Sequence, residues 1–179
     1  DAKIGLSNNF TLDLTVNPDF GQVEADPSII NLTAYETYFP EKRPFFIEGS
    51  NLFSFSMQSG DGDGASENLF YSRRIGRSPS LNRDTRDNEY VYTPSNTTIL
   101  GAAKISGRNN NGLSVGILES VTSNSWARID YNDKRSHELI EPLTSYFVGS
   151  VKKEFNKGNT IVNGILTSTN RQLTSATED

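Results

Sequence analysis

Cysteine is absent from this chain of 179 residues, which excludes a disulfide framework and a thiolate metal site. No stretch approaches eighteen consecutive apolar residues, and this excludes a transmembrane helix. Membrane-spanning strands stay open, because they need only about 9–11 residues with one apolar face. Basic runs are also missing, and the net charge of −5 is spread along the chain, so nucleic acid is not an expected partner.

Hydrophobic residues are scarce as well. They make up 34% of the chain, and the mean hydropathy is −0.53. The length still suffices for one domain with a core. Two arrangements fit these values: a modest core under long polar loops, or a sheet whose second face is wet. The lack of cysteine fits a cytosolic protein and equally an envelope protein stabilised by sheet closure.

The first segment, residues 1–16, has the pattern of a β-hairpin. Apolar and polar residues alternate over residues 3–7 and again over 10–16, which predicts two strands. Asn8 and Asn9 stand between them, and asparagine tolerates the positive φ of a tight turn. Asp13 lies in the middle of the second strand, so we expect the polar face of this hairpin to meet water.

The second segment, residues 17–97, predicts a helix followed by a plug-like polar loop. Asp26 and Pro27 form a good helix start, with an acceptor side chain at the N-cap and a preset φ at the first helical position. We expect this helix to run from Pro27 to about Thr37. Residues 51–88 show no sustained period, and a loop this long needs a function or a cavity to lie in.

The third segment, residues 98–179, predicts long β-hairpins. One turns at Asn109–Gly112 and the other at Asn156–Asn159, and a polar connection containing Trp126 and Tyr131 separates them. Each arm has roughly ten residues or more, longer than the usual strand of about 5–6 and matched to a tilted bilayer span. These hairpins favour an antiparallel meander that forms part of an outer-membrane-type β-barrel, and a soluble sandwich is an equally good alternative from pattern alone.

Charged residues interrupt the predicted strands. They are Lys104, Glu119, Lys152, Lys153 and Glu154. In a membrane barrel they must face the lumen or the interfaces, because a charge on the lipid face costs about 2–4 kcal/mol at the midplane. Lys104 is the most demanding, since it lies far from a turn. Its strand is expected to place Ile99, Gly101, Ala103 and Ile105 on one face, opposite Leu100, Ala102 and Lys104.

Several motifs together resemble the bacterial family catalogued as domain of unknown function 5916. They are NPDFGQVEADPSIINLTAYETYFPEKRPFFIEG, LFYSRRIGR, the ILGAAK strand and EPLTSYFVGSVKKEF. The resemblance covers nearly the whole chain. It implies a Gram-negative outer-membrane β-barrel, often preceded by a signal peptide and a domain similar to family-nine carbohydrate-binding modules. The chain is then expected to be a fragment of the barrel region. The resemblance transfers no catalytic residues.

The candidate binding residues all lie in the second segment. They are Glu41, Arg43, Glu48, Phe70, Tyr71, Arg73, Arg74 and Arg77. The Arg43 guanidinium could offer a planar fork to a carboxylate or phosphate. The favoured alternative is an ion-pair network that pins the segment to the barrel wall, with Phe45 and Phe46 as anchors. The later arginines could hold an anionic glycan or lipid head group beside Phe70 and Tyr71, or pair with Glu24, Asp26 or Glu36.

Metal binding and catalysis are less favoured. Asp61 and Asp63 are spaced as in calcium loops but lack the further ligands of an EF-hand. The acidic set Glu24, Asp26, Glu36 and Glu48 could supply a glycosidase pair. His137 is the only histidine, in a polar connection without a Gly-x-Ser-x-Gly nucleophile motif. We therefore expect no cofactor and no catalytic dyad.

The leading hypothesis is an outer-membrane β-barrel that passes or binds an envelope or extracellular solute, with a glycan or an anionic solute as the expected class. Its partners would be outer-membrane lipid and that solute. The alternatives are a secreted or periplasmic hydrolase acting on glycans, and a soluble β-rich binding module. A barrel predicts that Leu12, Leu14, Phe147 and Val151 form one apolar band, whereas a soluble fold predicts that they are buried.

Overall fold

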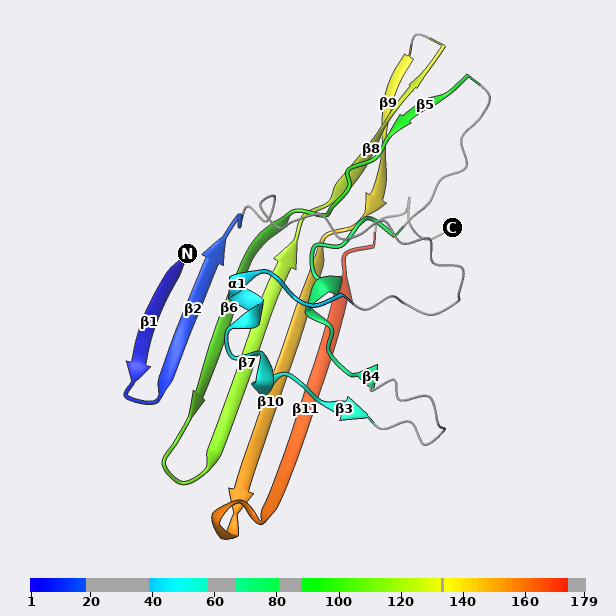
Figure 1. Cartoon of the computed structure of the whole chain (residues 1–179). Helices are drawn as coiled ribbons and strands as arrows, with labels where there is room; N and C mark the ends of the chain where they lie inside the picture. The colour runs from blue at the N-terminus through cyan, green and yellow to red at the C-terminus, as the bar shows by residue number, and fades with distance from the viewer. Residues whose placement is uncertain (19–38, 58–66, 81–87, 133, 174–179) are drawn as a thin grey trace.

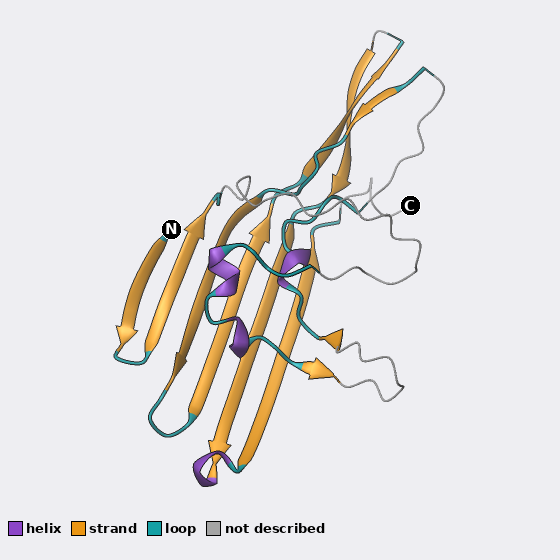
Figure 2. Ribbon diagram, viewed as in Figure 1, coloured by secondary structure: helices purple, strands orange, loops and turns teal. Residues whose placement is uncertain are grey.

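The computed structural model describes residues 1–18, 39–57, 67–80, 88–132 and 134–173. The described fold is mostly β, and all its strand pairs are antiparallel (Figures 1 and 2). This confirms the predicted fold class at the level of an antiparallel β protein. The predicted helix from Pro27 to Thr37 lies outside the described residues.

The large sheet has six strands in the order β1-β2-β6-β7-β10-β11. Their bounds are β1 Ala2–Ser7, β2 Phe10–Val16, β6 Ile99–Arg108, β7 Leu113–Thr122, β10 Thr144–Phe155 and β11 Thr160–Arg171. The predicted first hairpin and both long hairpins are therefore present. Their tight turns all lie at the same end of the sheet (Figure 1). Gly112 has φ +75°, in the left-handed region that favours glycine.

Two smaller sheets accompany the large one. Strand β3 (Ser56–Met57) pairs with β4 (Glu67–Asn68), and β8 (Ser125–Tyr131) pairs with both β5 (Tyr90–Tyr92) and β9 (Lys134–Glu141). The short helical elements are α1 Pro44–Ile47, η1 Ser50–Leu52, η2 Ser72–Arg74 and η3 Asn156–Gly158. Within the described ranges, no helix is long and apolar enough to cross a membrane.

The two faces of the large sheet differ sharply in polarity. On one face, the register aligns Ile4, Leu12, Ile105, Ile117, Gly149 and Leu166 across the strands. On the other, it aligns Lys3, Asp13, Lys104, Leu118, Val148 and Thr167. Side chains at paired positions share a face, so the first row lies on an apolar face and the second row on a face rich in polar groups.

The polar face is the one that is covered. Residues 39–57 and 67–80, here called the inserted loop, cross it with α1, η1 and η2 (Figure 1). The core lies between this loop and the sheet, and its buried members are Phe46, Phe53, Ile75, Ile99, Leu118 and Val148. We call the polar face of the large sheet the covered face. We call its apolar face the bare face, because large apolar side chains on it are exposed. Those side chains are Ile4, Leu6, Val16, Ile117, Val151, Phe155, Val162 and Leu166.

Three sequence expectations are wrong in detail. Asp13 itself does not meet water, because the covered position beneath the inserted loop leaves it only 7% exposed, although Lys3 and Thr167 on the same face are exposed. Ile99 does not share a face with Gly101, since the register shifts between them and Ile99 joins the core instead. The polar connection containing Trp126 is the β8–β9 hairpin.

A substitution at Gly116 on β7 tests whether the inserted loop packs directly against this strand. A Cβ at this position would lie 3.0 Å from ring atoms of Phe53 and 3.1 Å from Leu52 Cβ. We expect Gly116→Val to lower the free energy of unfolding by about 1–3 kcal/mol, because overpacking forces neighbours out of place. Gly164→Val is the matched control, since nothing lies within 4 Å of its Cβ position. Equal effects of the two changes in urea unfolding would contradict the docking described here.

Candidate functional site

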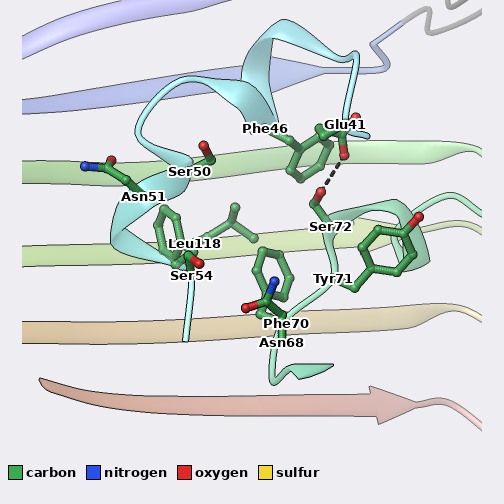
Figure 3. A pocket seen from close by; sticks show the side chains of 11 residues that line it. Glu41, Phe46, Ser50, Asn51, Ser54, Asn68, Phe70, Tyr71, Ser72 and Leu118 are labelled. Atoms are coloured by element: carbon green, nitrogen blue, oxygen red, sulfur yellow. Dashed lines mark hydrogen bonds between the residues drawn. The ribbon is translucent and has the colours of Figure 1, made fainter. Parts of the chain in front are cut away.

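A cavity of about 570 Å³ lies between the inserted loop and the covered face (Figure 3). Its lining residues are Glu41, Phe46, Ser50, Asn51, Phe53, Ser54, Asn68, Phe70, Tyr71, Ser72 and Leu118. Leu118 comes from strand β7 of the large sheet, and the other lining residues come from the inserted loop. The size is within the range of small-molecule sites, which are typically about 300–1,000 Å³.

Aromatic rings and an aliphatic side chain form the apolar part of the lining. Phe53 and Phe70 meet edge to face, with ring centroids 6.2 Å apart and planes at 63°. Leu118 completes the apolar lining and is 1% exposed (Figure 3). Edge-to-face pairs hold rings in defined orientations, so this wall is preformed.

Amide and hydroxyl groups form the polar part of the lining. Ser50, Asn51 and Ser54 come from the stretch around η1, and Asn68 comes from β4. The Asn68 Oδ1 atom is buried and has no hydrogen-bond partner among the described residues. A buried acceptor without a donor is costly. A ligand that brings a hydroxyl or N–H group into the cavity would satisfy it.

Arg43 closes one end of the site through a clasp with Glu41. Its Nε donates to Glu41 Oε1 at 2.8 Å, and its Nη2 donates to Glu41 Oε2 at 2.7 Å. The same guanidinium donates to the carbonyl oxygens of Ile75 at 2.7 Å and Ser72 at 2.8 Å. It also lies 4.2 Å above the centre of the Phe46 ring. One buried cation thus ties the two described parts of the inserted loop together.

Tyr71 and Arg73 reinforce the clasp. The Tyr71 hydroxyl accepts from the Phe39 backbone N–H at 2.8 Å and donates to the Phe39 carbonyl at 3.1 Å. Arg73 donates to the carbonyl of Pro40 at 2.8 Å. Ser72 donates its hydroxyl proton to Glu41 (Figure 3). These bonds hold residues 39–43 against η2, through side chains that bind the backbone at Phe39 and Pro40 and through the side-chain pair of Ser72 and Glu41.

Lys104 fixes the inserted loop to the sheet. Its ammonium group is 1% exposed and donates to the carbonyls of Phe45 at 2.5 Å and Glu48 at 2.7 Å. Asp13 supplies the opposite charge at 3.4 Å. The lysine that most challenged a membrane strand therefore points to the covered face. Glu48 also pairs with Lys3 of β1 through its carboxylate.

The structure brings together some of the predicted site residues. Glu41, Arg43, Phe70 and Tyr71 gather at the cavity or its clasp, whereas Glu48 pairs with β1. Arg73 binds the Pro40 backbone, and Arg74 and Arg77 are exposed. The predicted partners Glu24, Asp26 and Glu36, and the candidate metal ligands Asp61 and Asp63, lie outside the described residues. Among the residues described, no group of three His, Cys, Asp or Glu could hold a metal ion.

Sequence reasoning missed Phe53, Asn68, Ser72 and Leu118. Ser72 lies within the aromatic and basic stretch of residues 69–77, and Asn68 directly precedes it, so the composition of this stretch carries a signal for both. Phe53 and Leu118 carried none, because their contact joins positions far apart in the chain and depends on how the loop docks.

Protonation of Glu41 at low pH should weaken the clasp between Glu41 and Arg43. Burial opposes ionisation of this carboxyl, but the hydrogen bonds and charge of Arg43, with the Ser72 hydroxyl, outweigh burial and hold its pKa below the ordinary 4.5. Because the folded pKa lies below the unfolded one, the stabilisation is complete above about pH 4.5 and is lost as pH falls through the folded pKa. We expect Glu41→Gln to be less stable than the original chain at pH 7, with a smaller difference at pH 3. A pH-independent difference in urea unfolding would contradict this.

The fold and site define a class of protein: an antiparallel β protein whose large sheet carries a long inserted loop over its polar face, with a cavity between them. The chain belongs to the family described as Domain of unknown function (DUF5916), whose model matches residues 1–178. This confirms the family resemblance of the sequence motifs. No curated protein and no solved structure matches the chain.

Proposed function

We propose that the large sheet is part of the wall of a β-barrel in the outer membrane of a Gram-negative cell, and that the inserted loop folds into the lumen to bind or gate a small solute. One observation carries this proposal: the sheet is apolar on its bare face and polar on its covered face. Water-soluble sheets bury the apolar face instead. A barrel in lipid has an apolar exterior and a polar interior.

Strand length supports the same arrangement. Strands β6 and β7 have 10 residues each, and β10 and β11 have 12 each. At a rise of roughly 3.3 Å per residue and a tilt of about 45°, such strands cover an apolar band of about 25 Å. Strands β1 and β11 each pair on one side only among the described residues, so the proposed barrel needs further strands to close it.

Two charged side chains of the bare face bind neighbouring polar groups. Glu119 is the seventh of the ten residues of β7 and accepts a hydrogen bond from the Ser145 hydroxyl. Lys153 is near the turn after β10 and donates to the carbonyl of Asn111 in the neighbouring turn at 2.6 Å. The position of Lys153 suits a bilayer interface, where a charge costs about 0–1 kcal/mol. At Glu119, the hydrogen bond from Ser145 offsets part of the cost of the carboxylate.

The chemistry of the cavity favours a small polar solute with an apolar face, such as a sugar. Aromatic rings can cover the C–H surface of a sugar. Asn51, Asn68 and the serine hydroxyls can exchange hydrogen bonds with its hydroxyl groups. The described lining contains one carboxylate, Glu41, and Arg43 holds it in the clasp. A glycosidase needs two carboxyl groups across the scissile bond, so the binding function is favoured over hydrolysis.

Cell fractionation tests the membrane proposal. We expect the native protein to stay in the outer-membrane fraction until detergent is added, and to change mobility on a denaturing gel between unboiled and boiled samples. The physical reason is that a closed barrel keeps its structure in detergent until heated, since closure leaves no free strand edge. Recovery in the soluble fraction without detergent would overturn the proposal.

A further inference from the structure

The β5–β8–β9 sheet has one face rich in exposed aromatic and charged side chains. This sheet lies beyond the end of the large sheet that is opposite the tight turns (Figure 1). This face, here called the aromatic face, carries Tyr90, Tyr92, Trp126, Arg128, Asp130, Arg135 and His137, with the buried Leu139 opposite Trp126. It shares no residue with the cavity under the inserted loop, and the proposed solute site leaves it without a role.

Strand register places these side chains together. Tyr92 pairs with Arg128, which pairs with His137 on the far strand. Two residues further along β8, Asp130 pairs with Tyr90 on one side and with Arg135 on the other. Paired residues of antiparallel strands lie on one face. Trp126 is two residues before Arg128 on β8, so it also belongs to this face.

The two faces of β8 are exposed to different degrees. On the aromatic face, the rings of Tyr90, Tyr92 and Trp126 are 61%, 53% and 49% exposed. On the opposite face, Ala127 is fully buried and Ile129 is 5% exposed. The strand therefore packs its small and aliphatic side chains and leaves its largest rings in solvent, which is the reverse of what core packing favours. Exposed apolar surface of this kind marks interaction sites.

Two guanidinium groups accompany the rings. Arg135 Nε binds Asp130 Oδ1 at 2.8 Å, and Arg128 Nε lies 4.0 Å from Asp130 Oδ2. Arg128 also lies 5.5 Å from the centre of the Tyr92 ring. The side chains of Arg128 and Arg135 are 45% and 64% exposed. Two cations against one carboxylate leave the aromatic face with an excess of positive charge.

We propose that the aromatic face binds an acidic oligosaccharide. Aromatic rings suit the C–H faces of sugar rings, and an exposed guanidinium can bind a sugar carboxylate through two parallel N–H···O bonds. Asp130 holds the Arg135 guanidinium in place and can accept a hydrogen bond from a sugar hydroxyl. The positive excess selects acidic over neutral sugars of the same size. This site is separate from the cavity and does not depend on it.

Trp126 is the only tryptophan of the chain, so intrinsic fluorescence reports on this face alone. We would titrate the full chain in detergent micelles with hexagalacturonate, and with maltohexaose as the neutral sugar of equal length. The expected result is a saturable change in Trp126 emission with the acidic sugar, weakened by added salt, and none with the neutral sugar. Arg128→Gln should weaken binding about tenfold or more, because a hydrogen bond to a charged group is lost.

Arg171→Gln is the matched control, because it removes an exposed arginine of β11 in the large sheet. Circular dichroism of each variant checks that its β structure is retained, and Tyr92→Ala should weaken binding while Tyr92→Phe keeps the stacking ring. Equal responses to the two sugars, no saturable response, or unaltered binding by Arg128→Gln would each overturn the proposal. So would quenching of Trp126 by brominated phospholipid with no effect of either sugar, which would assign this face to the membrane interface.

Discussion

Arg43→Met is expected to lower the free energy of unfolding by about 3–5 kcal/mol, since removing one partner of a buried pair leaves the other charge uncompensated. The Arg43 residue is 8% exposed, and its guanidinium makes a bidentate pair with Glu41 and two bonds to backbone carbonyls. Methionine keeps much of the side-chain volume but leaves the carboxylate and both carbonyls without this donor. Urea unfolding at pH 7 measures the loss.

Arg77→Met is the control for this experiment. Arg77 belongs to the same inserted loop but is exposed, and such surface changes usually stay within about 0.5 kcal/mol. In a double-mutant cycle, Glu41→Gln should cost much less in the Arg43→Met background than alone, because both changes break one interaction. Additive effects would show that the clasp does not hold the loop. If the loop narrows a lumen, Arg43→Met should also increase solute leakage from vesicles that contain the protein.

Ile117→Arg is expected to cause the second largest loss in the free energy of unfolding, and to cause it only when the protein is in a bilayer. Ile117 is in the middle of β7 on the bare face and is 39% exposed. If this face meets lipid, arginine there should cost about 2–4 kcal/mol near the midplane. If the face meets water, the same change on an exposed side chain should stay near 0.5 kcal/mol. Urea unfolding of the protein in phospholipid vesicles, followed by circular dichroism of its β structure, measures the difference in the free energy of unfolding.

Thr167→Arg is the matched control for Ile117→Arg. Thr167 is an exposed residue of β11 on the other side of the large sheet, where its register partner is Val148. A charge on the lumen side is tolerated in a barrel, so this variant should unfold close to the original chain. Equal losses for the two arginine variants would contradict a lipid-facing bare face.

The alternation of apolar and polar residues, with the turn residues between, was enough to predict most strands of the large sheet. The bounds of β2 match the alternating stretch of residues 10–16, and the Asn-Gly pair at Asn111 and Gly112 marks the turn between β6 and β7. Period-two alternation constrains a strand directly, since every second side chain must share a face. Alternation alone did not reveal the bulge after Ile99, because a register shift depends on the partner strand.

The candidate site was harder to predict, because its contacts join distant parts of the chain. Lys104 has no local partner that would explain a buried ammonium group, and its acceptors are the carbonyls of Phe45 and Glu48. The aromatic-basic composition around Arg43 and Tyr71 did indicate a packed polar cluster. The cavity itself could not be read from the chain, since it results from how the inserted loop docks on β7.

The most direct test of the membrane proposal uses spin labels on β11. The chain has no cysteine, so Gly164→Cys, Leu166→Cys, Asn163→Cys and Thr167→Cys each give one labelling site. Gly164 and Leu166 lie on the bare face, and Asn163 and Thr167 on the opposite face. In vesicles, we predict that labels at Gly164 and Leu166 collide with oxygen and are shielded from a water-soluble nickel complex, with the reverse at Asn163 and Thr167. Access of the nickel complex to all four labels would show that the bare face meets water and would contradict the barrel.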